Sequence, residues 1–296
     1  MSDKVDIAVK RLKEAAEMSQ ALYEQPLVIT YSGGKDSDTI LKLAQIAKIP
    51  FEVLHSHTTV DAPETVYHVR DKFRELELAG VKCDIDYHVQ PDGKRMTMWN
   101  LIPQKTMPPT RAVRYCCAEL KEGGAKGRFI ATGVRWDESR ARKNNRGVLE
   151  VMASRKEKRI VLANDNDDNR MLFENCQMKG KRIVNPIVDW TTSDVLDFCS
   201  ENKVRLCALY AAGWKRVGCV GCPMAGTKMR YNEFAQYPTY KKAFIAAFDR
   251  MIEERKKRGK MEGDMRMGYT GIDVFHWWME DGILPGQTVL PGFEDV

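Results

Sequence analysis

The chain has 296 residues, 43% of them hydrophobic and 30% charged, and its 47 basic and 41 acidic residues give a net charge of +6. This composition is typical of a globular protein and excludes a collagen-like or low-complexity chain. No apolar run is long enough for a transmembrane helix, and the segment 1–25 has the pattern of an amphipathic helix, not of a signal peptide. We therefore expect a cytoplasmic protein without a membrane partner, and a charge of +6 does not by itself indicate nucleic-acid binding.

After the N-terminal helix, the short β-branched run at 27–31 predicts a buried strand, and helical spacing of apolar residues begins after Asp36. Further strands are predicted at 51–54, 81–89 and 129–134, and further helices at 63–78, 191–202, 233–257 and 272–280. Alternating strands and helices predict an α/β fold with a three-layer parallel sheet. We expect a nucleotide-binding domain over 1–225 and a small helical C-terminal extension over 226–296.

The turn between the first strand and the next helix has the composition of a phosphate-binding loop. Its glycines let the backbone approach an anion closely, and the start of the following helix offers free N–H groups. Lysine and hydroxyl side chains add a positive charge and hydrogen-bond donors. The loop consists of Ser32, Gly33, Gly34, Lys35, Asp36 and Ser37. It differs from the common GxxxxGK[ST] nucleotide loop, so an ordinary NTPase is not expected.

These six residues resemble the PP-loop of the adenine-nucleotide α-hydrolases, and three further blocks are similar to those of the PAPS and APS reductases. The blocks are Thr59 to Thr65, Gly133-Val134-Arg135 with Glu138-Ser139-Arg140, and Pro186 to Trp190 with Asp194-Val195. The resemblance covers roughly residues 25 to 225. It implies a PP-loop (HUP-like) fold that binds ATP or an adenylyl-sulfate, with chemistry at the α-phosphate.

That chemistry builds negative charge on the phosphate oxygens and on the departing pyrophosphate, so cations and amides are needed there. We expect catalytic roles for Lys35, Asp36, Arg135 and Arg140, since arginine grips two oxygens at once. Asp61 and Gly133 are expected to join the loop in nucleotide binding. Asp36 or Asp61 is the expected Mg²⁺ ligand.

Four of the eight cysteines form a second pattern, Cys116-Cys117 followed by Cys219-Val220-Gly221-Cys222. Adjacent cysteines suit a zinc site poorly, whereas a [4Fe–4S] cluster accepts neighbouring thiolates. The order also resembles the iron–sulfur branch of the adenylyl-sulfate reductases. We expect these four to bind a [4Fe–4S] cluster at the mouth of the nucleotide cleft, with structural zinc or redox-active thiols as alternatives. The expected role of Cys83, Cys176, Cys199 and Cys207 is core packing.

The chain departs from the reductases in having no cysteine after Cys222 to attack the sulfate sulfur. It also carries basic runs between Ser139 and Arg159, which suit either a solvated loop or a polyanionic partner. Adenylyl or sulfur transfer is therefore the preferred function, to a nucleic-acid or small-molecule acceptor and with a sulfur donor protein. Reduction of an adenylyl-sulfate and a nucleotide- or redox-sensing module without turnover are the alternatives. The oligomeric state stays open.

Overall fold

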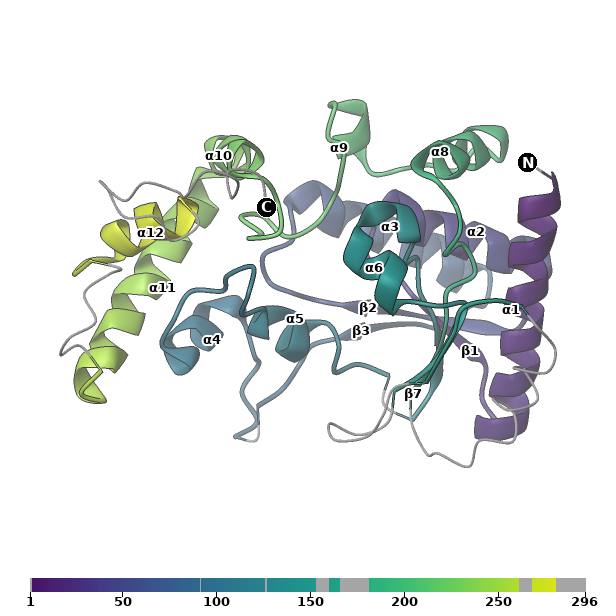
Figure 1. Ribbon diagram of the computed structural model, residues 1–296, viewed down its shortest axis with the longest axis horizontal. Coiled ribbons are helices and arrows are strands. Elements are labelled where there is room, and N and C mark those ends of the chain that lie inside the picture. Colours follow the sequence, from purple (N-terminus) through teal and green to yellow (C-terminus); the bar gives the residue numbers. More distant parts are fainter. Residues whose placement is uncertain are drawn as a thin grey trace. The chain divides into compact units, whose positions relative to one another are not determined.

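The computed structural model describes residues 2–90, 92–125, 127–152, 160–165, 181–260 and 268–280 (Figure 1). Its internal contacts divide the chain into two compact units. The first unit contains Met1–Ser56, Pro63–Asp86 and Gly124–Gly218, and the second contains His57–Ala62, Tyr87–Gly123 and Cys219–Val296. This division differs from the boundary at residue 225 expected from the sequence, because the second unit also takes in two segments from the first half of the chain.

The first unit alternates strands with helices. It contains, in chain order, α1 (Ser2–Tyr23), β1 (Leu27–Thr30), α2 (Lys35–Ala47), β2 (Phe51–Ser56), α3 (Pro63–Leu78), β3 (Cys83–Asp86), β4 (Phe129–Ala131), the 3₁₀ turn η1 (Trp136–Glu138), α6 (Arg140–Asn145), β5 (Leu149–Met152), β6 (Ile160–Leu162), β7 (Lys181–Val184), α8 (Thr192–Glu201) and α9 (Ala208–Ala211). Pro63 is the first residue of α3, a position that suits proline, and Thr191 caps α8 by accepting a hydrogen bond from the backbone N–H of Asp194.

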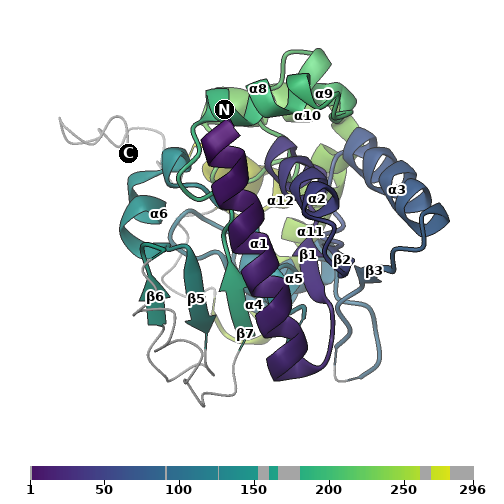
Figure 2. The same cartoon turned by 90° about the vertical axis from the view of Figure 1, so that its right-hand side faces the viewer.

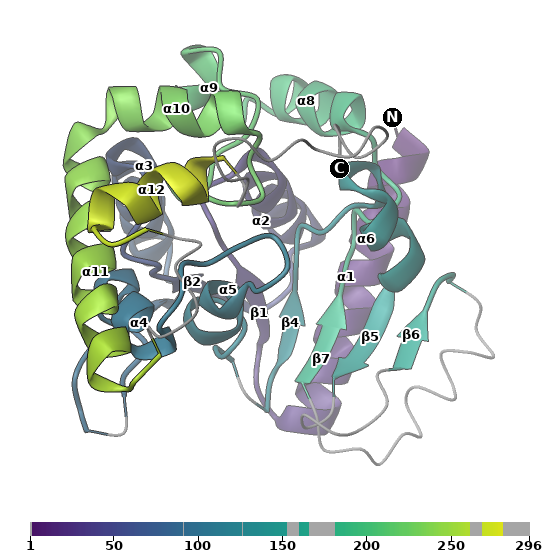
Figure 3. The same ribbon diagram turned by 60° about the vertical axis from the view of Figure 1, so that its left-hand side comes forward.

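Seven strands form one sheet in the order β3-β2-β1-β4-β7-β5-β6. The five strands from β3 to β7 are parallel, with Leu27 opposite Phe51 and Val28 opposite Ile130 in the centre. At the other side β5 runs antiparallel to both β7 and β6, and Figure 3 shows this edge. The predicted α/β class is thus confirmed, and the sheet, predicted to be parallel, is parallel except in the two pairings of β5.

Helices α1, α2 and α3 lie on one face of this sheet (Figure 2). Apolar side chains of these helices and of the strands bury a continuous core, which includes Leu12 of α1, Ile40 of α2 and Ile29 of β1. Val28, Ile130 and Ile183 form a smaller apolar cluster of their own. Sheet and helices supply two of the three expected layers.

The second unit is helical, with α4 (Met98–Lys105), α5 (Tyr115–Leu120), α10 (Thr227–Gln236), α11 (Pro238–Lys257) and α12 (Gly271–Met279). Helices α4, α10 and α12 contact α11. Aromatic rings fill the space between them: the centroids of Phe244 and Trp278 are 4.9 Å apart, and those of Phe234 and Phe275 are 5.1 Å apart. Trp278 is buried in this aromatic core.

Two expectations about elements need correction. The single helix predicted over 233–257 is two helices, α10 and α11, because Pro238 begins a new helix and disfavours helical geometry at Tyr237. The region from Ser139 to Arg182, which shows no clear pattern in the sequence, contains α6 and the strands β5, β6 and β7. The second basic run, at 155–159, and Cys176 lie outside the described residues.

Candidate functional site

The sheet has a topological switch point between β1 and β4. Chain order leads from β1 outward to β2 and β3 on one side, and the next parallel strand, β4, lies on the other side of β1. In open α/β sheets such a switch point leaves a crevice at the carboxyl ends of the two strands, where ligands bind. The loop Ser32–Ser37 follows β1 and Gly133 follows β4, so two of the sequence-predicted segments meet at this position.

The two glycine positions at this crevice are needed for close packing. Gly33 has a φ of +75°, and a Cβ there would lie 3.0 Å from Cγ2 of Thr65 and 3.1 Å from Cγ2 of Val69. A Cβ on Gly133 would lie 3.0 Å from the backbone carbonyl carbon of Asp36. The loop is therefore wedged between α3 on one side and the segment after β4 on the other.

Side chains of the loop are hydrogen-bonded to the loop itself. Ser32 Oγ contacts Ser37 Oγ at 3.3 Å, and Ser37 Oγ donates to the backbone carbonyl of Gly34 at 2.7 Å. Lys35 Nζ pairs with Asp36 at 2.9 Å. Gly34 is the N-cap of α2 and, as a glycine, supplies no side-chain cap of its own. The N-terminal end of the α2 dipole lies at the crevice.

Arg135 lies against Asp36 and is almost fully buried. Its Nε donates to Asp36 Oδ1 at 2.7 Å, and its two terminal nitrogens bond to Asp137 Oδ2, to the backbone carbonyl of Trp190 and to Thr192 Oγ1. This guanidinium therefore orients Asp36 and the loop. Arg140, by contrast, is exposed at the first residue of α6.

Tyr210, which the sequence analysis missed, contacts the loop from α9. Its hydroxyl oxygen accepts a hydrogen bond from the backbone N–H of Lys35 at 3.0 Å. Burial raises the pKa of Tyr210 to about 12, to which the charges of Asp36 and Asp38 contribute. Nothing in the sequence around Tyr210 signals this contact, because α9 is only four residues long.

A buried polar cluster of three residues supports the loop. The Tyr31 hydroxyl donates to Asp38 Oδ1 at 2.6 Å, and His68 Nε2 lies 3.0 Å from Asp38 Oδ2. Tyr31 precedes the loop, Asp38 follows it in the first turn of α2, and His68 belongs to α3. The cluster thus ties both ends of the loop to a neighbouring helix.

Asp61, expected to bind nucleotide or Mg²⁺, belongs to the second unit and is buried there. Its Oδ2 accepts hydrogen bonds from the backbone N–H of Thr58 at 3.1 Å and from Thr58 Oγ1 at 2.7 Å. An isolated β-bridge pairs it with Cys219, whose Sγ lies 3.5 Å from Thr58 Oγ1. The structure therefore brings Asp61 next to a predicted metal ligand.

The four cysteines of the predicted cluster all lie in the second unit, each half-buried and without a disulfide. A hydrogen bond from the Cys116 thiol, together with the charges of Lys121 and Arg114, lowers the pKa of Cys117 to about 6. That bond, burial and the negative charges of Cys117, Cys219 and Cys222 raise the pKa of Cys116. The charge of Cys219, followed by those of Asp61 and the other thiolates, raises the pKa of Lys121.

The four thiols lie close enough to influence one another's pKa. Four cysteine thiolates are the ligands that an iron–sulfur cluster requires. Within the described ranges, however, no three or more His, Cys, Asp or Glu side chains are arranged to hold a metal ion. The turn between Cys219 and Cys222 is tight: Gly221 has a φ of +71°, and a Cβ there would lie 2.4 Å from Phe234 Cζ. The residue types therefore fit a cluster, while the side chains do not adopt a ligating arrangement.

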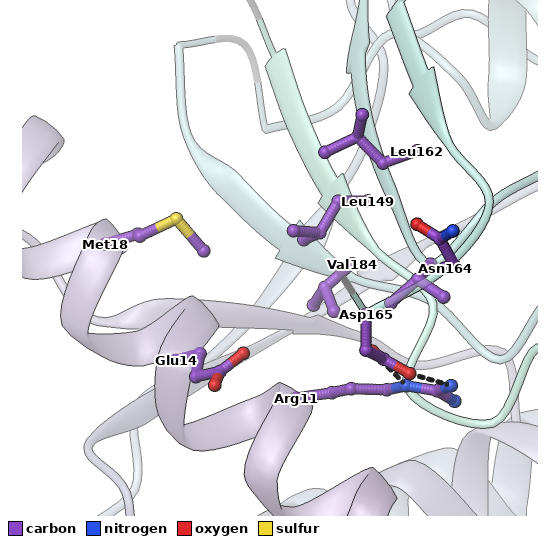
Figure 4. A pocket seen from close by; sticks show the side chains of 9 residues that line it. Arg11, Glu14, Met18, Leu149, Leu162, Asn164, Asp165 and Val184 are labelled. Atoms are coloured by element: carbon purple, nitrogen blue, oxygen red, sulfur yellow. Dashed lines mark hydrogen bonds and ion pairs between the residues drawn. The ribbon is translucent and has the colours of Figure 1, made fainter. Parts of the chain in front are cut away.

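A separate pocket of the first unit contains none of the predicted site residues. It lies between α1 and the strands β5 to β7 and is lined by Arg11, Glu14, Met18, Val148, Leu149, Leu162, Asn164, Asp165 and Val184 (Figure 4). Arg11 is paired there with Asp165 at 2.8 Å and with Asp189 at 2.9 Å. Two carboxylates thus neutralise the Arg11 guanidinium. We infer that Arg11 holds α1 against the rest of the unit and does not bind a ligand.

No helix in the described part of the chain is long and apolar enough to cross a membrane.

Several known proteins are similar to this chain in sequence or in structure. Sulfate adenylyltransferase subunit 2 of Stutzerimonas stutzeri (strain A1501) is 30% identical over 198 residues, which are 64% of this chain and 61% of that protein. The protein of the same name from Mycolicibacterium vanbaalenii is 30% identical over 222 residues, 71% of this chain and 64% of its own. The chain thus spans less than two thirds of the length of these relatives.

Among solved structures, the phosphoadenylyl-sulfate reductase of Candida auris matches with a TM-score of 0.41 and 19% identity, over 73% of this chain and 93% of its own. The U34-tRNA thiolase NcsA of Methanococcus maripaludis, solved with its [4Fe–4S] cluster, matches with a TM-score of 0.41 and 14% identity, over 86% and 84%. The sequence model of the phosphoadenosine phosphosulfate reductase domain matches residues 26–225, more than half of the chain. The chain therefore belongs to the phosphoadenosine phosphosulfate reductase domain family.

Proposed function

We propose that this chain is an enzyme that binds ATP at the loop Ser32–Ser37 and transfers the adenylyl group, or sulfur by way of an adenylylated acceptor. The observation that carries the proposal is the position of the loop at the switch point between β1 and β4, with the start of helix α2 at its end. Membership of the family supports a nucleotide with a reactive group at the α-phosphate. The name of the Stutzerimonas relative supports adenylyl transfer in particular.

In the proposed reaction an acceptor oxygen attacks the α-phosphorus of ATP. The new oxygen–phosphorus bond forms as the bond to the bridging oxygen breaks, and pyrophosphate leaves with the electron pair. Lys35 and the N–H groups at the start of α2 stabilise the negative charge on the phosphates. Asp36 would hold Mg²⁺, and Arg135 positions Asp36 through the 2.7 Å contact. Arg140, exposed at the first residue of α6, is the cation proposed for the departing pyrophosphate. Gly133 keeps the opposite wall close to the loop.

Cys116, Cys117, Cys219 and Cys222 would hold a [4Fe–4S] cluster in the second unit, beside Asp61. When bound, such a cluster supplies a site for handling sulfur or electrons. The acceptors that suit this chemistry are an oxyanion such as sulfate, a small molecule, or a nucleic acid attracted by the basic residues of α6, with a partner protein as the sulfur donor.

Reduction of an adenylyl-sulfate is the second candidate, and the name of the matching family favours it. The two candidates differ in their products. Adenylyl transfer releases pyrophosphate from ATP, whereas reduction releases sulfite from the adenylyl-sulfate and needs an external thiol.

The test uses the anaerobically purified full chain, supplied either with Mg-ATP and sulfate or RNA as acceptor, or with an adenylyl-sulfate and a thiol. Pyrophosphate and sulfite are measured in each. We expect pyrophosphate from ATP, and a rate lower by roughly 10²-fold in Lys35→Ala, because one cation at the developing charge is lost. Lys13→Ala, on the exposed face of α1, is the matched control and should be unchanged.

Sulfite without pyrophosphate would replace adenylyl transfer with reduction. ATP binding without either product would leave a nucleotide-sensing module, the third alternative raised by the sequence. Equal rates in Lys35→Ala and the wild type would show that the loop is only a turn.

A further inference from the structure

Tyr210 brings a hydroxyl group to the start of the phosphate loop. Its oxygen lies 3.0 Å from the backbone nitrogen of Lys35, the first residue of α2, and 3.5 Å from the position that a Cβ on Gly34 would take. The first N–H groups of a helix are the donors that bind anions. The phenol therefore lies at the place where phosphate oxygens approach this loop.

The direction of the Lys35 contact determines what the phenol can do next. A phenol has one proton and can both accept and donate. Here the backbone N–H of Lys35 is the donor, so the Tyr210 oxygen is the acceptor and its own proton points elsewhere. In the described residues, no acceptor is found for that proton. Such a proton is available to a ligand.

The phenol also keeps its proton at the pH of the cell. Burial raises the pKa of Tyr210 to about 12, and the charges of Asp36 and Asp38 act in the same direction. A raised pKa favours the protonated form, so the hydroxyl remains a donor at every pH below this value. A neutral donor next to a helix N-terminus has no charge that would oppose an anion.

We propose that Tyr210 is a nucleotide-binding residue that donates its hydroxyl proton to a phosphate oxygen of the bound nucleotide. The inference rests on the proposed function and adds a residue to the same site. The Lys35 N–H polarises the phenol, which makes the phenol a better donor, and the helix dipole acts in the same direction. Tyr210 thus extends the anion-binding end of α2 by one hydrogen bond, from a segment 175 positions later in the chain.

The opposite role for the same contact is occlusion, in which the phenol occupies the Lys35 N–H and a phosphate must displace it. The two roles give opposite results when the hydroxyl is removed. A donor lost from the site weakens binding of phosphates, and a competitor lost from the site strengthens it.

The experiment compares Tyr210→Phe with the wild type by calorimetric titration with Mg-ATP and, separately, with adenosine. Phenylalanine keeps the ring and removes only the hydroxyl. Tyr231→Phe, which changes an exposed tyrosine of α10, is the matched control. Thermal unfolding of all three proteins checks that the fold is retained. If Tyr210→Phe unfolds, Tyr210→His, which keeps a ring donor at the site, takes its place: it should retain more ATP affinity than Tyr210→Leu.

For Tyr210→Phe we expect the Kd for Mg-ATP to rise at least 10-fold, because one hydrogen bond to a charged group is lost, while the Kd for adenosine stays within about 2-fold. Unchanged or tighter ATP binding overturns the inference, and tighter binding identifies occlusion. An equal loss for ATP and adenosine also overturns it, since that is the mark of a displaced loop. If the wild-type chain binds neither Mg-ATP nor adenosine, the proposed function itself is refuted. The wild-type titration distinguishes this outcome from a failure of the Tyr210 inference alone.

Discussion

At the scale of single residues, Asp36 determines the charge of the loop. Two cations contact its carboxylate, Lys35 at 2.9 Å and Arg135 at 2.7 Å, so the three groups together carry one net positive charge. A cation at a helix N-terminus opposes the dipole, and the carboxylate offsets this cost. A Mg²⁺ ion held by Asp36, as proposed, would compete with Lys35 for this carboxylate.

The two arginines proposed for the site should separate into a structural and a surface role. Arg135→Ala removes a buried guanidinium and leaves Asp36 without its partner, so we expect the free energy of unfolding to fall by about 3 kcal/mol. Arg140→Ala changes an exposed residue and should alter stability by less than about 0.5 kcal/mol while weakening Mg-ATP binding. Urea unfolding and ATP titration of both variants measure this. Equal stabilities would show that Arg135 is dispensable for the fold.

The loop residues could be predicted from the sequence because their spacing is local: a strand, two glycines and a helix start are adjacent in the chain. Tyr210 could not be predicted, since its contact with Lys35 joins positions far apart and its own helix is too short to show periodicity. The burial of Arg135 could not be predicted for a similar reason. An arginine is usually exposed, and the partners that make its burial possible, Asp36, Asp137 and Thr192, come together only in the folded chain.

At the scale of elements, the cluster of Tyr31, Asp38 and His68 fastens β1, α2 and α3 to one another beneath the loop. Burial, followed by the charge of Asp38 and the hydrogen bond to it, raises the pKa of Tyr31. In the unfolded chain a tyrosine ionises near pH 10. Below that pH the contribution of Tyr31 to stability is fully present. As the pH rises above it, the unfolded state releases a proton that the folded state retains, and stability is lost.

Tyr31→Phe should therefore flatten the alkaline side of the stability curve. Near pH 8 the variant loses one hydrogen bond to a buried carboxylate, which costs about 1–3 kcal/mol. Above about pH 10 the wild type should lose up to about 1.4 kcal/mol more per pH unit than the variant. Urea unfolding across this range measures the difference. Tyr67→Phe, on the exposed face of α3, should follow the wild type, and parallel curves for Tyr31→Phe would contradict the assignment.

Strand β5 shows why part of the sheet escaped prediction. Glu150 is fully buried in this strand, where a carboxylate is not expected. Its Oε1 accepts hydrogen bonds from Arg146 Nε at 2.8 Å, from the backbone N–H of Gly147 at 3.2 Å and from Asn185 Nδ2 at 2.8 Å. These partners come from the segment just before β5 and from the residue after β7, and only the folded sheet brings them together. The charged residues that obscured the strand in the sequence are the ones that stabilise it.

At the scale of the whole molecule, the boundary was predicted at residue 225 because only helices are predicted after that point, whereas strands and helices alternate before it. The second unit instead gathers His57–Ala62 and Tyr87–Gly123 around the C-terminal helices. Val220 N–H donates to the backbone carbonyl of Val60 at 2.8 Å, and the Tyr240 hydroxyl to that of Asp61 at 2.7 Å. Such long-range pairings leave no local signal in the sequence.

The proposed cluster can be tested on the full chain. Anaerobic reconstitution with iron and sulfide should give a brown protein with broad visible absorbance and about four iron atoms per chain. Cys222→Ser and Cys116→Ser should remove the colour and most of the iron. Cys83→Ser, in β3 of the first unit, should retain both. Stoichiometric zinc without iron would favour the structural-zinc alternative, and iron retained in the first two variants would refute the assignment of these ligands.

The division of the second unit among three chain segments has a consequence for biosynthesis. Cys116 and Cys117 leave the ribosome about 100 residues before Cys219, and the helices that complete their unit follow later still. At a synthesis rate of roughly 5 to 20 residues per second, Cys116 and Cys117 are exposed for about 5 to 20 seconds before Cys219 and Cys222 are made. Throughout that interval two neighbouring thiols are open to oxidants and to stray metal ions. A nascent chain with this connectivity depends on the reducing power of its surroundings before it depends on its own fold.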